Sequence, residues 1–519
     1  MKRSERSDSN PPSVAPSLLK REPTGSRKQK GLGNETAVSV RKLKNYLGGV
    51  WKETESQRSL VVDDPVTGRP RCEVPFSDEE DVQEAVSSAR DAFSFWSRIP
   101  PRKRAEVISR YRELVQRASE DIARTMTLER GVTLDESRRN VKLGLESLEY
   151  ACSLPAHMPS YAAQLVEGID WQTTRHPVGV FASLTPYYLP DVASLWLWPY
   201  AVVCGNSFIV KPSRHVPMTQ NLMFELVDQA GFPEGVVNLL HGDRQTADAL
   251  VSHPQVDGVS FIGPRGQASD VISRAATLGK RIRAVGRSRA CFVVMPDADM
   301  DAVIPALISS CFGGNGQHCL AGSMVIAVDD RQKTFSKGFM EAAKRIVIGP
   351  GIETDVELGP MISVQAHDQA CSFVQDLSDS GSKVLLDGRG VEVPNHPNGR
   401  WLGPTILEGF PKGTPLCDEV LAPIAFLEQV ETLSQACDLV RLCDAVGVAS
   451  CYTASGKTAR AFRERSGVSM TSINVGLPDA TTLLYWGGVQ GAFLGDIKAH
   501  GREAIRFYTD ESAVLSRWE

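Results

Sequence analysis

Apolar residues recur at helical spacing through the first third of the chain. A capping-box pair, Ser77 and Glu80, precedes a stripe that includes Val82, Ala85 and Ala89. This spacing predicts a helix that begins near Ser77. The same kind of pattern predicts three further helices, over residues 104–118, 120–130 and 134–150.

Between residues 178 and 296, short β-rich runs alternate with helical patterns. Alternation at this interval indicates right-handed βαβ crossovers and a parallel, doubly wound sheet. Ligands of such sheets bind at the carboxyl ends of the strands. The predicted strands are 179–184, 207–211, 236–241, 258–263 and 291–295, and the predicted helices are 218–229, 245–252 and 267–277.

A second run of strands and helices extends from about residue 299 to residue 469, with β-rich segments at 324–327, 425–428 and 446–452. Upstream of the helical region, residues 43–51 are predicted to form a strand. Two α/β halves that face each other would enclose a cleft for a cofactor and a substrate. We therefore predict the α/β fold class, with two sheets.

The composition mainly excludes certain partners and kinds of site. The 519 residues are 42% hydrophobic and 23% charged with a net charge of −5, so no overall field attracts nucleic acid or an anionic membrane, and neither is expected as a partner. The longest apolar run, residues 192–205, is broken by Pro199 and is shorter than the ~20 residues that cross a bilayer. Eleven cysteines without a C-x-x-C pair or a metal-spaced cluster indicate a reducing compartment and no metal site.

The N-terminal segment, to about Thr36, is rich in Ser, Pro, Gly and basic residues and has few apolar ones. Such a segment buries too little surface to offset its ordering entropy, so a disordered basic tail is predicted over residues 1–40. Its lysines and arginines suit a mitochondrial leader, whereas Glu5, Asp8 and Glu22 argue against one. The expected location is the cytoplasm, with the mitochondrion as the alternative.

A glycine-rich segment precedes Cys319. Gly313, Gly314 and Gly316 allow backbone to approach backbone, and a turn at this point can direct main-chain N–H groups at a developing oxyanion. The Cys319 thiol would then act as a nucleophile. On these residues alone, the favoured interpretation of Cys319 is a small buried apolar side chain.

Several motifs occur in the order typical of one family. From about Leu43 to Trp518 the chain resembles the aldehyde dehydrogenase superfamily, most closely its coenzyme-A-acylating methylmalonate-semialdehyde dehydrogenases. The resemblance rests on Pro177–Val180, Thr185–Pro190, Val203–Asn206, Lys211–Ser213, Gly316–Cys319, Leu358–Pro360, Gly403–Thr405, Asp496, Phe507–Thr509 and Trp518.

The resemblance implies a Rossmann-like cofactor domain, an α/β catalytic domain and a bridging β-arm. Residues 41–154 and 173–286 would form the cofactor domain, residues 287–496 the catalytic domain, and residues 155–172 and 497–519 the arm. It also implies a homo-oligomer, a dimer or a tetramer, assembled through a terminal strand near residues 504–518.

The implied chemistry begins with addition of the Cys319 thiolate to a small aldehyde. Hydride then passes to NAD or NADP, and a thioester remains on the cysteine. Family members that release free acid carry a glutamate base at a position that falls on or beside Val285, where this chain has no carboxylate. Its absence fits coenzyme A as the acyl acceptor, and it fits an inactive site equally well.

The implied site departs from the family pattern. Tyr188 replaces the asparagine that, with the Cys319 amide, holds the oxyanion, and Arg214 replaces a glutamate that binds the adenosine ribose, which makes NADP plausible. The resemblance places the cofactor at Thr185, Lys211, Ser213, Arg214, Gly263, Pro264, Glu419 and Leu421, where Pro264 replaces a serine and Leu421 a phenylalanine.

Substrate selectivity is altered too. His318 and Leu143 stand where the semialdehyde enzymes have two arginines that hold the substrate carboxylate. Two hypotheses follow. The first is an acylating NAD(P)-dependent dehydrogenase with Cys319 as nucleophile. The second is a protein of the same fold with impaired turnover that acts as a binding or assembly subunit.

Overall fold

The computed structural model separates the chain into two units, Met1–Ser39 and Val40–Glu519. The residues that it describes all lie in the second unit. They are residues 40–286, 289–330, 333–410, 420–443, 446–468, 470–477, 493–494 and 501–518.

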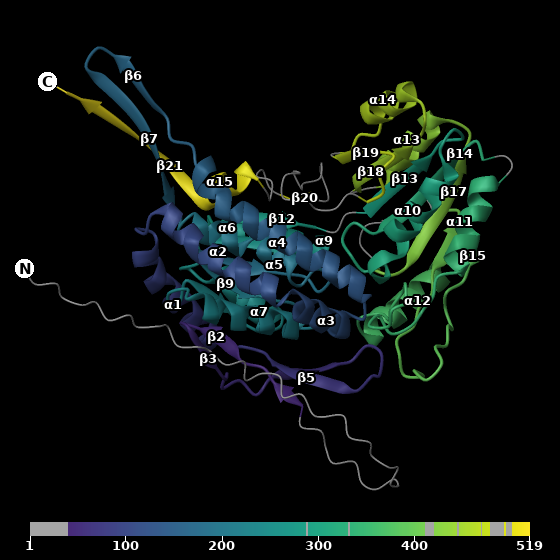
Figure 1. Ribbon diagram of the computed structural model, residues 1–519, viewed down its shortest axis with the longest axis horizontal. Coiled ribbons are helices and arrows are strands. Elements are labelled where there is room, and N and C mark those ends of the chain that lie inside the picture. Colours follow the sequence, from purple (N-terminus) through teal and green to yellow (C-terminus); the bar gives the residue numbers. More distant parts are fainter. Residues whose placement is uncertain are drawn as a thin grey trace, which may run out of the picture. The chain divides into compact units, whose positions relative to one another are not determined.

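The first sheet has eight strands in the order β20-β12-β11-β8-β9-β10-β2-β3 (Figure 1). Its central strands, from β12 to β10, are parallel, as predicted, and the outer strands are antiparallel. The strands are β8 (Val180–Leu184), β9 (Ser207–Lys211), β10 (Val237–Leu239), β11 (Gly258–Ile262), β12 (Arg281–Val285), β20 (Phe493–Leu494), β2 (Asn45–Leu47) and β3 (Val50–Lys52).

Helices cover both faces of this sheet, which explains why its strands are apolar on both sides. Ala182 and Ile209 pack against one group of helices, and Phe181 and Phe208 pack against the other. The first group is α1 (Glu79–Trp96), α8 (Arg244–Ser252) and α9 (Arg265–Thr277); the second is α2 (Pro101–Arg117), α3 (Ser119–Arg130), α4 (Leu134–His157), α5 (Val192–Leu195), α6 (Trp198–Val203) and α7 (Pro217–Ala230).

Two local predictions in this region were wrong in detail. The strand expected over residues 43–51 is a hairpin of β2 and β3, because Gly48 and Gly49 take positive φ angles of 60° and 83° and reverse the chain. The capping box of α1 is formed by Asp78 and Asp81, one residue later than expected. The Ser77 hydroxyl instead accepts a hydrogen bond from Asn45 Nδ2 at 2.8 Å.

The second sheet has seven strands in the order β15-β16-β17-β14-β13-β18-β19. The strand expected over residues 291–295 was grouped with the first run, but β13 pairs with β14 and β18 of the second sheet. The strands are β13 (Arg289–Val294), β14 (Gly322–Val328), β15 (Lys383–Leu386), β16 (Thr405–Glu408), β17 (Ile424–Val430), β18 (Val446–Tyr452) and β19 (Met470–Ile473).

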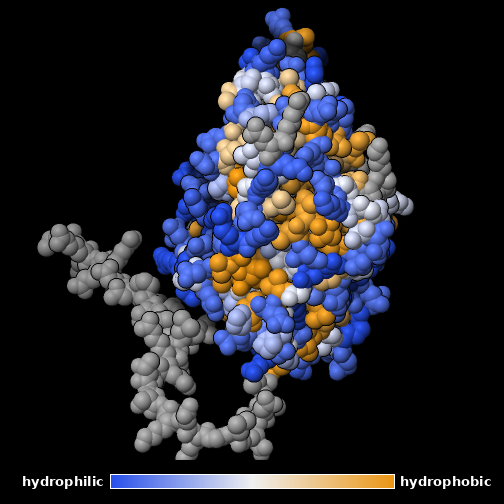
Figure 2. All heavy atoms as spheres, turned by 90° about the vertical axis from the view of Figure 1, so that its right-hand side faces the viewer, coloured by the Kyte–Doolittle hydropathy of each residue, from blue (hydrophilic) through white to orange (hydrophobic). Residues whose placement is uncertain are grey.

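The helices of this half are α10 (Met300–Phe312), α11 (Thr334–Lys344), α12 (Val364–Asp379), α13 (Leu433–Leu442) and α14 (Gly456–Arg465). Figure 2 shows the side of the molecule on which they lie, where apolar surface alternates with polar surface. Exposed apolar side chains on these helices include Val364 and Leu442.

Two three-stranded sheets complete the fold. One contains β1 (Arg41–Lys42), β4 (Ser59–Asp63) and β5 (Pro70–Pro75), and the other contains β6 (Ala162–Val166), β7 (Ile169–Pro177) and β21 (Thr509–Arg517). The strand predicted over residues 504–518 therefore begins later, because residues Arg502–Tyr508 form the helix α15. The predicted domain boundaries stay predictions.

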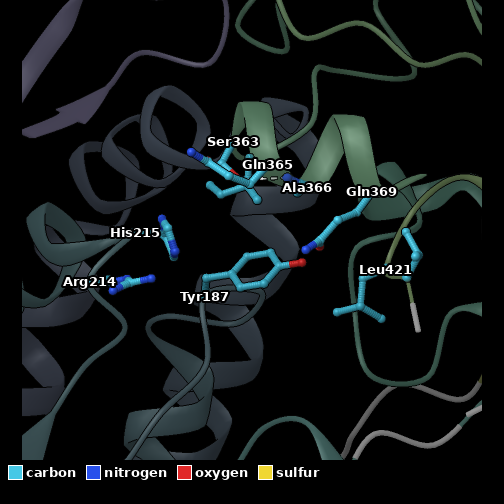
Figure 3. Close-up of a pocket in the computed structure, with 10 residues that line it drawn as sticks. Tyr187, Arg214, His215, Ser363, Gln365, Ala366, Gln369 and Leu421 are labelled. Carbon is cyan, nitrogen blue, oxygen red and sulfur yellow. Dashed lines mark hydrogen bonds between the residues drawn. The ribbon is translucent and has the colours of Figure 1, made fainter. Parts of the chain in front are cut away.

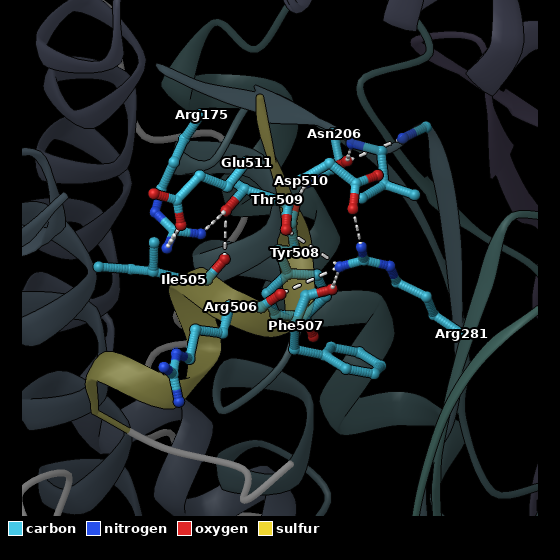
Figure 4. A network of polar contacts seen from close by, with 12 residues as sticks. Arg175, Asn206, Arg281, Ile505, Arg506, Phe507, Tyr508, Thr509, Asp510 and Glu511 are labelled. Atoms are coloured by element: carbon cyan, nitrogen blue, oxygen red, sulfur yellow. Dashed lines mark hydrogen bonds and ion pairs between the residues drawn. The ribbon is translucent and has the colours of Figure 1, made fainter. Parts of the chain in front are cut away.

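The side chains of Arg281, in β12, and of Asn206, directly before β9, hold the backbone of the C-terminal segment (Figure 4). Arg281 Nη1 donates to the carbonyls of Arg506, Phe507 and Thr509 at 3.0, 2.7 and 3.1 Å. Asn206 Nδ2 donates to the Tyr508 carbonyl at 2.9 Å. The strand β21 is thereby attached to the sheet that lies beside the predicted cofactor site.

Within the described ranges, no helix is both long and apolar enough to span a membrane. The same residues contain no cluster of three or more His, Cys, Asp or Glu side chains suited to a metal ion.

Candidate active site

A cavity of about 430 Å³ lies where the parallel strands of the first sheet end. Thr185 follows β8, Lys211 ends β9, and Gly263 and Pro264 follow β11. These four residues and the predicted Ser213 and Arg214 all line this cavity. Carboxyl ends of parallel strands are the usual ligand site of such a sheet, so we define this space as the cofactor cavity.

Two buried polar groups in the cofactor cavity have unused hydrogen-bonding capacity. Lys211 Nζ donates to the Pro212 carbonyl at 3.1 Å, and burial lowers the pKa of Lys211 to about 8. Thr185 Oγ1 is buried without a hydrogen-bond partner in the described part of the chain. A ligand with hydroxyl or phosphate oxygens would satisfy both, because an ammonium carries three donors and a hydroxyl can donate or accept.

The N-terminus of α9 borders the same cavity. Pro264 is the N-cap residue and makes no side-chain cap, so the first N–H groups of this 13-residue helix have no capping side chain. Pro264 and Gln267 line the cavity at this point. The helix dipole and these N–H groups favour an anion, so this end of α9 could hold a phosphate group.

A second cavity, of about 270 Å³, shares Tyr187, Arg214 and His215 with the first and is also lined by Leu421. Figure 3 shows the Tyr187 ring between the Arg214 and His215 side chains and Leu421, with its hydroxyl directed at Gln369 of α12. The predicted cofactor residue Leu421 thus lies next to Arg214. Glu419 lies outside the described residues.

Cys319 lines a third cavity, of about 160 Å³, together with Tyr188, Leu143 and His318. We define it as the thiol cavity. The structure therefore brings the predicted nucleophile, the predicted oxyanion residue and both predicted substrate positions together. Cys319 is 7% exposed, and burial lowers the pKa of His318 to about 4, so this imidazole is neutral near pH 7.

The turn before Cys319 has the backbone geometry expected from its glycines. Gly314, Asn315 and Gly316 have φ angles of 62°, 57° and 62°, within the short 3₁₀ segment η1 (Gly313–Gly316). A Cβ on Gly316 would lie 2.1 Å from the carbonyl oxygen of Ala422. The predicted close approach of backbone to backbone is confirmed, and it joins the turn to the segment that carries Leu421.

Asn315 fixes the other side of this turn. Its Oδ1 accepts from the Gly359 amide at 2.8 Å, and its Nδ2 donates to the Pro360 carbonyl at 2.9 Å. Gly359 in turn lies so close to the end of α3 that a Cβ there would be 1.7 Å from the Gly131 carbonyl oxygen. The Leu358–Pro360 motif therefore connects the nucleophile turn to the C-terminus of α3.

Tyr188 lines both the cofactor cavity and the thiol cavity and is 1% exposed. It forms part of the wall between the two. The carboxylate that lines the thiol cavity belongs to Glu136, whose Oε2 accepts from the Gly314 amide at 2.8 Å. Val285, at the end of β12, has no carboxylate to offer.

Sequence reasoning missed several residues that line these cavities. Tyr187 and His215 border the cofactor cavity, and Arg130, Glu136 and Arg139 border the thiol cavity. The sequence did contain one signal that pointed to Arg139. Arg139 precedes Leu143 by four residues in a predicted helix, and side chains four residues apart lie on the same face.

Comparison with known proteins identifies the family. The aldehyde dehydrogenase family matches residues 51–514. The malonate-semialdehyde dehydrogenase 1 of Geobacillus kaustophilus is 34% identical over 479 residues, which are 92% of this chain and 98% of that protein. The malonate-semialdehyde dehydrogenase of Halalkalibacterium halodurans is 33% identical over 483 residues, 92% of this chain and 98% of the relative.

Two solved structures are similar throughout. A protein of Sinorhizobium meliloti described as a methylmalonate-semialdehyde dehydrogenase, solved with NAD, gives a TM-score of 0.89 at 28% identity and covers 93% of this chain and 99% of its own. The methylmalonate-semialdehyde dehydrogenase of Oceanimonas doudoroffii gives 0.88 at 32% identity, with 92% and 99% covered. The chain belongs to the aldehyde dehydrogenase family.

Proposed function

We propose that the protein oxidises a short-chain semialdehyde with NAD or NADP through a thioester on Cys319, and that coenzyme A accepts the acyl group. One observation carries the proposal: Cys319 lies in a small cavity that shares the wall residue Tyr188 with the cofactor cavity. A thiol in this position faces an aldehyde on one side and a dinucleotide on the other.

The chemistry requires little of the protein beyond position and charge. The Cys319 sulfur adds to the aldehyde carbon, and the carbonyl oxygen becomes an oxyanion that the Cys319 amide and the Tyr188 hydroxyl would stabilise. A nicotinamide dinucleotide held in the cofactor cavity would supply the acceptor for the hydride from that carbon. The carbon–oxygen double bond re-forms as a thioester, and transfer of the acyl group to the thiol of coenzyme A regenerates the Cys319 thiolate.

The residues of the cofactor cavity support a nicotinamide dinucleotide. Lys211 and Thr185 would contact the ribose, and the N-terminus of α9 would contact the diphosphate. The structure from Sinorhizobium meliloti was solved with NAD. Arg214, which borders both this cavity and its neighbour, supports NADP in addition, because a guanidinium pairs well with a 2′-phosphate.

Two features support coenzyme A over water as the acyl acceptor. Val285 provides no carboxylate at the position of the water-activating base. The carboxylate of Glu136 already accepts the Gly314 amide and holds the nucleophile turn. The names of the relatives support a semialdehyde as the substrate.

Assembly into a homo-oligomer is part of the proposal. The sheet of β6, β7 and β21 presents exposed apolar side chains, and unpaired apolar surface on a sheet is typical of a subunit contact. Val166 is 59% exposed, Leu515 64% and Trp518 69%. A dimer or a tetramer formed through this sheet would cover them.

The test is turnover with a thiol-specific control. Purified protein is mixed with NAD or NADP, coenzyme A and a panel of short aldehydes, and formation of reduced nicotinamide is followed by absorbance. We expect activity in the wild type and in Cys311→Ala, a buried cysteine on α10 that does not line the thiol cavity. Cys319→Ala should abolish it. Retained activity in Cys319→Ala would overturn the proposal.

The position of Tyr188 favours one second candidate, a subunit with impaired turnover. A buried phenol between the two cavities both replaces the oxyanion amide and narrows the path for hydride. The outcome that supports this candidate is cofactor binding, measured by calorimetry, without turnover of any aldehyde in the panel.

A further inference from the structure

Two arginines from successive helices line the thiol cavity. Arg130 is the last residue of α3, and Arg139 lies in the second turn of α4. Gly131, with a φ of 80°, ends α3 directly after Arg130, and a Cβ on it would be 2.6 Å from Pro360 Cγ. This packing fixes the point from which the Arg130 side chain extends.

Arg130 is buried with unused hydrogen-bonding capacity. It is 3% exposed, and its Nη1 has no hydrogen-bond partner among the described residues. A buried charged donor without a partner is unfavourable, and removal of water from it makes the interaction with an anion stronger. Burial also lowers the pKa of Arg130, which is the direction expected for a guanidinium that lacks full compensation.

The charges that line the cavity favour an anionic ligand. Arg130 and Arg139 contribute two positive charges, and Glu136 contributes one negative charge that is directed at the Gly314 amide. His318 adds no charge near pH 7, because burial lowers its pKa to about 4. The cavity therefore carries a net positive charge next to the Cys319 thiol.

We propose that Arg130 and Arg139 are the specificity-determining residues that bind the carboxylate of the substrate, with the aldehyde at its other end directed to Cys319. This inference rests on the proposed function. It assigns the carboxylate contact to α3 and to the start of α4, not to positions 143 and 318, where arginine is absent. Guanidinium groups bind carboxylates through paired hydrogen bonds, which neither leucine nor a neutral imidazole can form.

The size of the thiol cavity limits the ligand. Its volume of about 160 Å³ is smaller than that of the cofactor cavity, about 430 Å³. Leu143, Leu189 and Trp196 supply an apolar lining between the charged ends. This space suits an unbranched or singly branched aldehyde acid of three or four carbons.

The chain offers a matched control for Arg139. The adjacent Arg138 has the same charge on the same helix, but its guanidinium pairs with Glu120 and Asp135 on the outer surface and does not line the cavity. Arg138→Gln removes one positive charge from α4 without changing the cavity. Any effect of Arg139→Gln beyond that of Arg138→Gln reports on the cavity itself.

The first measurement does not depend on turnover. Cys319 is alkylated with iodoacetamide in the presence of malonate, of malonamide as its uncharged analogue, or of inorganic phosphate, and the modified peptide is quantified by mass spectrometry. We expect malonate to slow the alkylation of Cys319 in the wild type and in Arg138→Gln, and malonamide to have no effect. Arg139→Gln should raise the protective malonate concentration at least tenfold.

The second measurement compares succinate semialdehyde with butanal, which lacks only the carboxylate. We expect Arg139→Gln to lower kcat/KM for succinate semialdehyde at least tenfold, mainly through KM, and to leave butanal unchanged. Because loss of the buried Arg130 can unfold the protein, Arg130→Lys is used in its place and its melting temperature is compared with that of the wild type. A folded Arg130→Lys should show the same preferential loss.

The outcomes separate this inference from the proposed function. Malonate protection that Arg139→Gln abolishes, without turnover of any aldehyde, supports the carboxylate site and contradicts the dehydrogenase. Turnover without malonate protection contradicts the carboxylate site alone. Equal protection by phosphate, or an equal effect of Arg138→Gln, also overturns the assignment, because it indicates a general attraction of anions.

Discussion

Tyr188 and Cys319 line the same cavity of about 160 Å³, and Tyr188 also lines the cofactor cavity. In the proposed reaction, a hydride that leaves a substrate carbon on Cys319 would pass close to the phenol ring. The same ring would bring a hydroxyl donor to the proposed oxyanion. Replacement of the family's asparagine thus changes two properties of the site at once, its width and its hydrogen bonding.

Tyr188→Phe separates these two properties, because it keeps the ring and removes the hydroxyl. We expect kcat to fall by about two to three orders of magnitude, which is typical of the loss of one oxyanion donor. Cofactor affinity should stay constant. Steady-state kinetics with calorimetric titration of the cofactor would measure both, with Tyr200→Phe, a buried tyrosine outside the cavities, as the control. An unchanged kcat in Tyr188→Phe would exclude the phenol as a donor.

Gly316→Ala tests the geometry of the nucleophile turn. The added Cβ would lie 2.1 Å from the Ala422 carbonyl oxygen at a φ of 62°, so the backbone must move. We expect a folded protein of lower stability in which Cys319 alkylation and kcat both change by more than tenfold. Gly456→Ala, at the start of α14 with no atom within 3.8 Å of the new Cβ, should leave both unchanged.

Arg214→Glu tests the choice of dinucleotide. A carboxylate at this position accepts hydrogen bonds from ribose hydroxyls and repels a 2′-phosphate, whereas the native guanidinium attracts one. We expect the Kd for NADP to rise and the Kd for NAD to fall, with the ratio of the two changing by at least tenfold. Arg117→Glu, an exposed residue at the end of α2, serves as the control for charge. An unchanged ratio would contradict a role for Arg214 in selecting the cofactor.

Asp191→Asn tests how the titration of a buried carboxyl group changes the stability of the protein. Burial raises the pKa of Asp191 from 3.8 to about 6, so between these values the folded protein binds more protons than the unfolded chain. Wild-type stability contributed by this group is therefore lost as the pH rises through 6. From pH 5 to pH 8 we expect the free energy of unfolding of Asp191→Asn to rise relative to the wild type by about 1.4 kcal/mol, a tenfold change.

Urea unfolding at pH 5, 6, 7 and 8 measures this difference. The histidines with lowered pKa values, His215, His241 and His318, destabilise the fold in acid in both proteins, and their effects cancel in the comparison. A difference that does not depend on pH would show that Asp191 titrates as it does in the unfolded chain.

The regular elements of the first sheet were predictable because local pattern determines them. The strand at residues 207–211 has the predicted bounds, since a short apolar run between turn residues leaves little freedom. Pairing between distant segments was not predictable. The alternation of strands and helices does not say to which sheet a strand belongs, and the placement of residues 291–295 was wrong for that reason.

For the site, too, local motifs were predictable and contacts between distant segments were not. Motifs located Cys319, Tyr188 and Lys211 because each follows a recognisable strand or turn. Arg130 and Arg139 belong to no motif, and only the packing of α3 and α4 against the nucleophile turn brings them to the thiol. The buried Arg130 could not be found from local sequence, because its neighbours in the site are distant in the chain, whereas the spacing of Arg139 from Leu143 gave a partial signal.

The contact between Gly359 and the Gly131 carbonyl, together with the two hydrogen bonds of Asn315, ties the helix that ends at Arg130 to the turn that carries Cys319. The positions of the Arg130 and Cys319 backbones relative to each other are therefore set by these packing contacts. The side chains of Arg130 and Cys319 therefore extend from fixed backbone positions. An aldehyde acid much longer than four carbons could not place its carboxylate at Arg130 and its aldehyde at Cys319 at the same time.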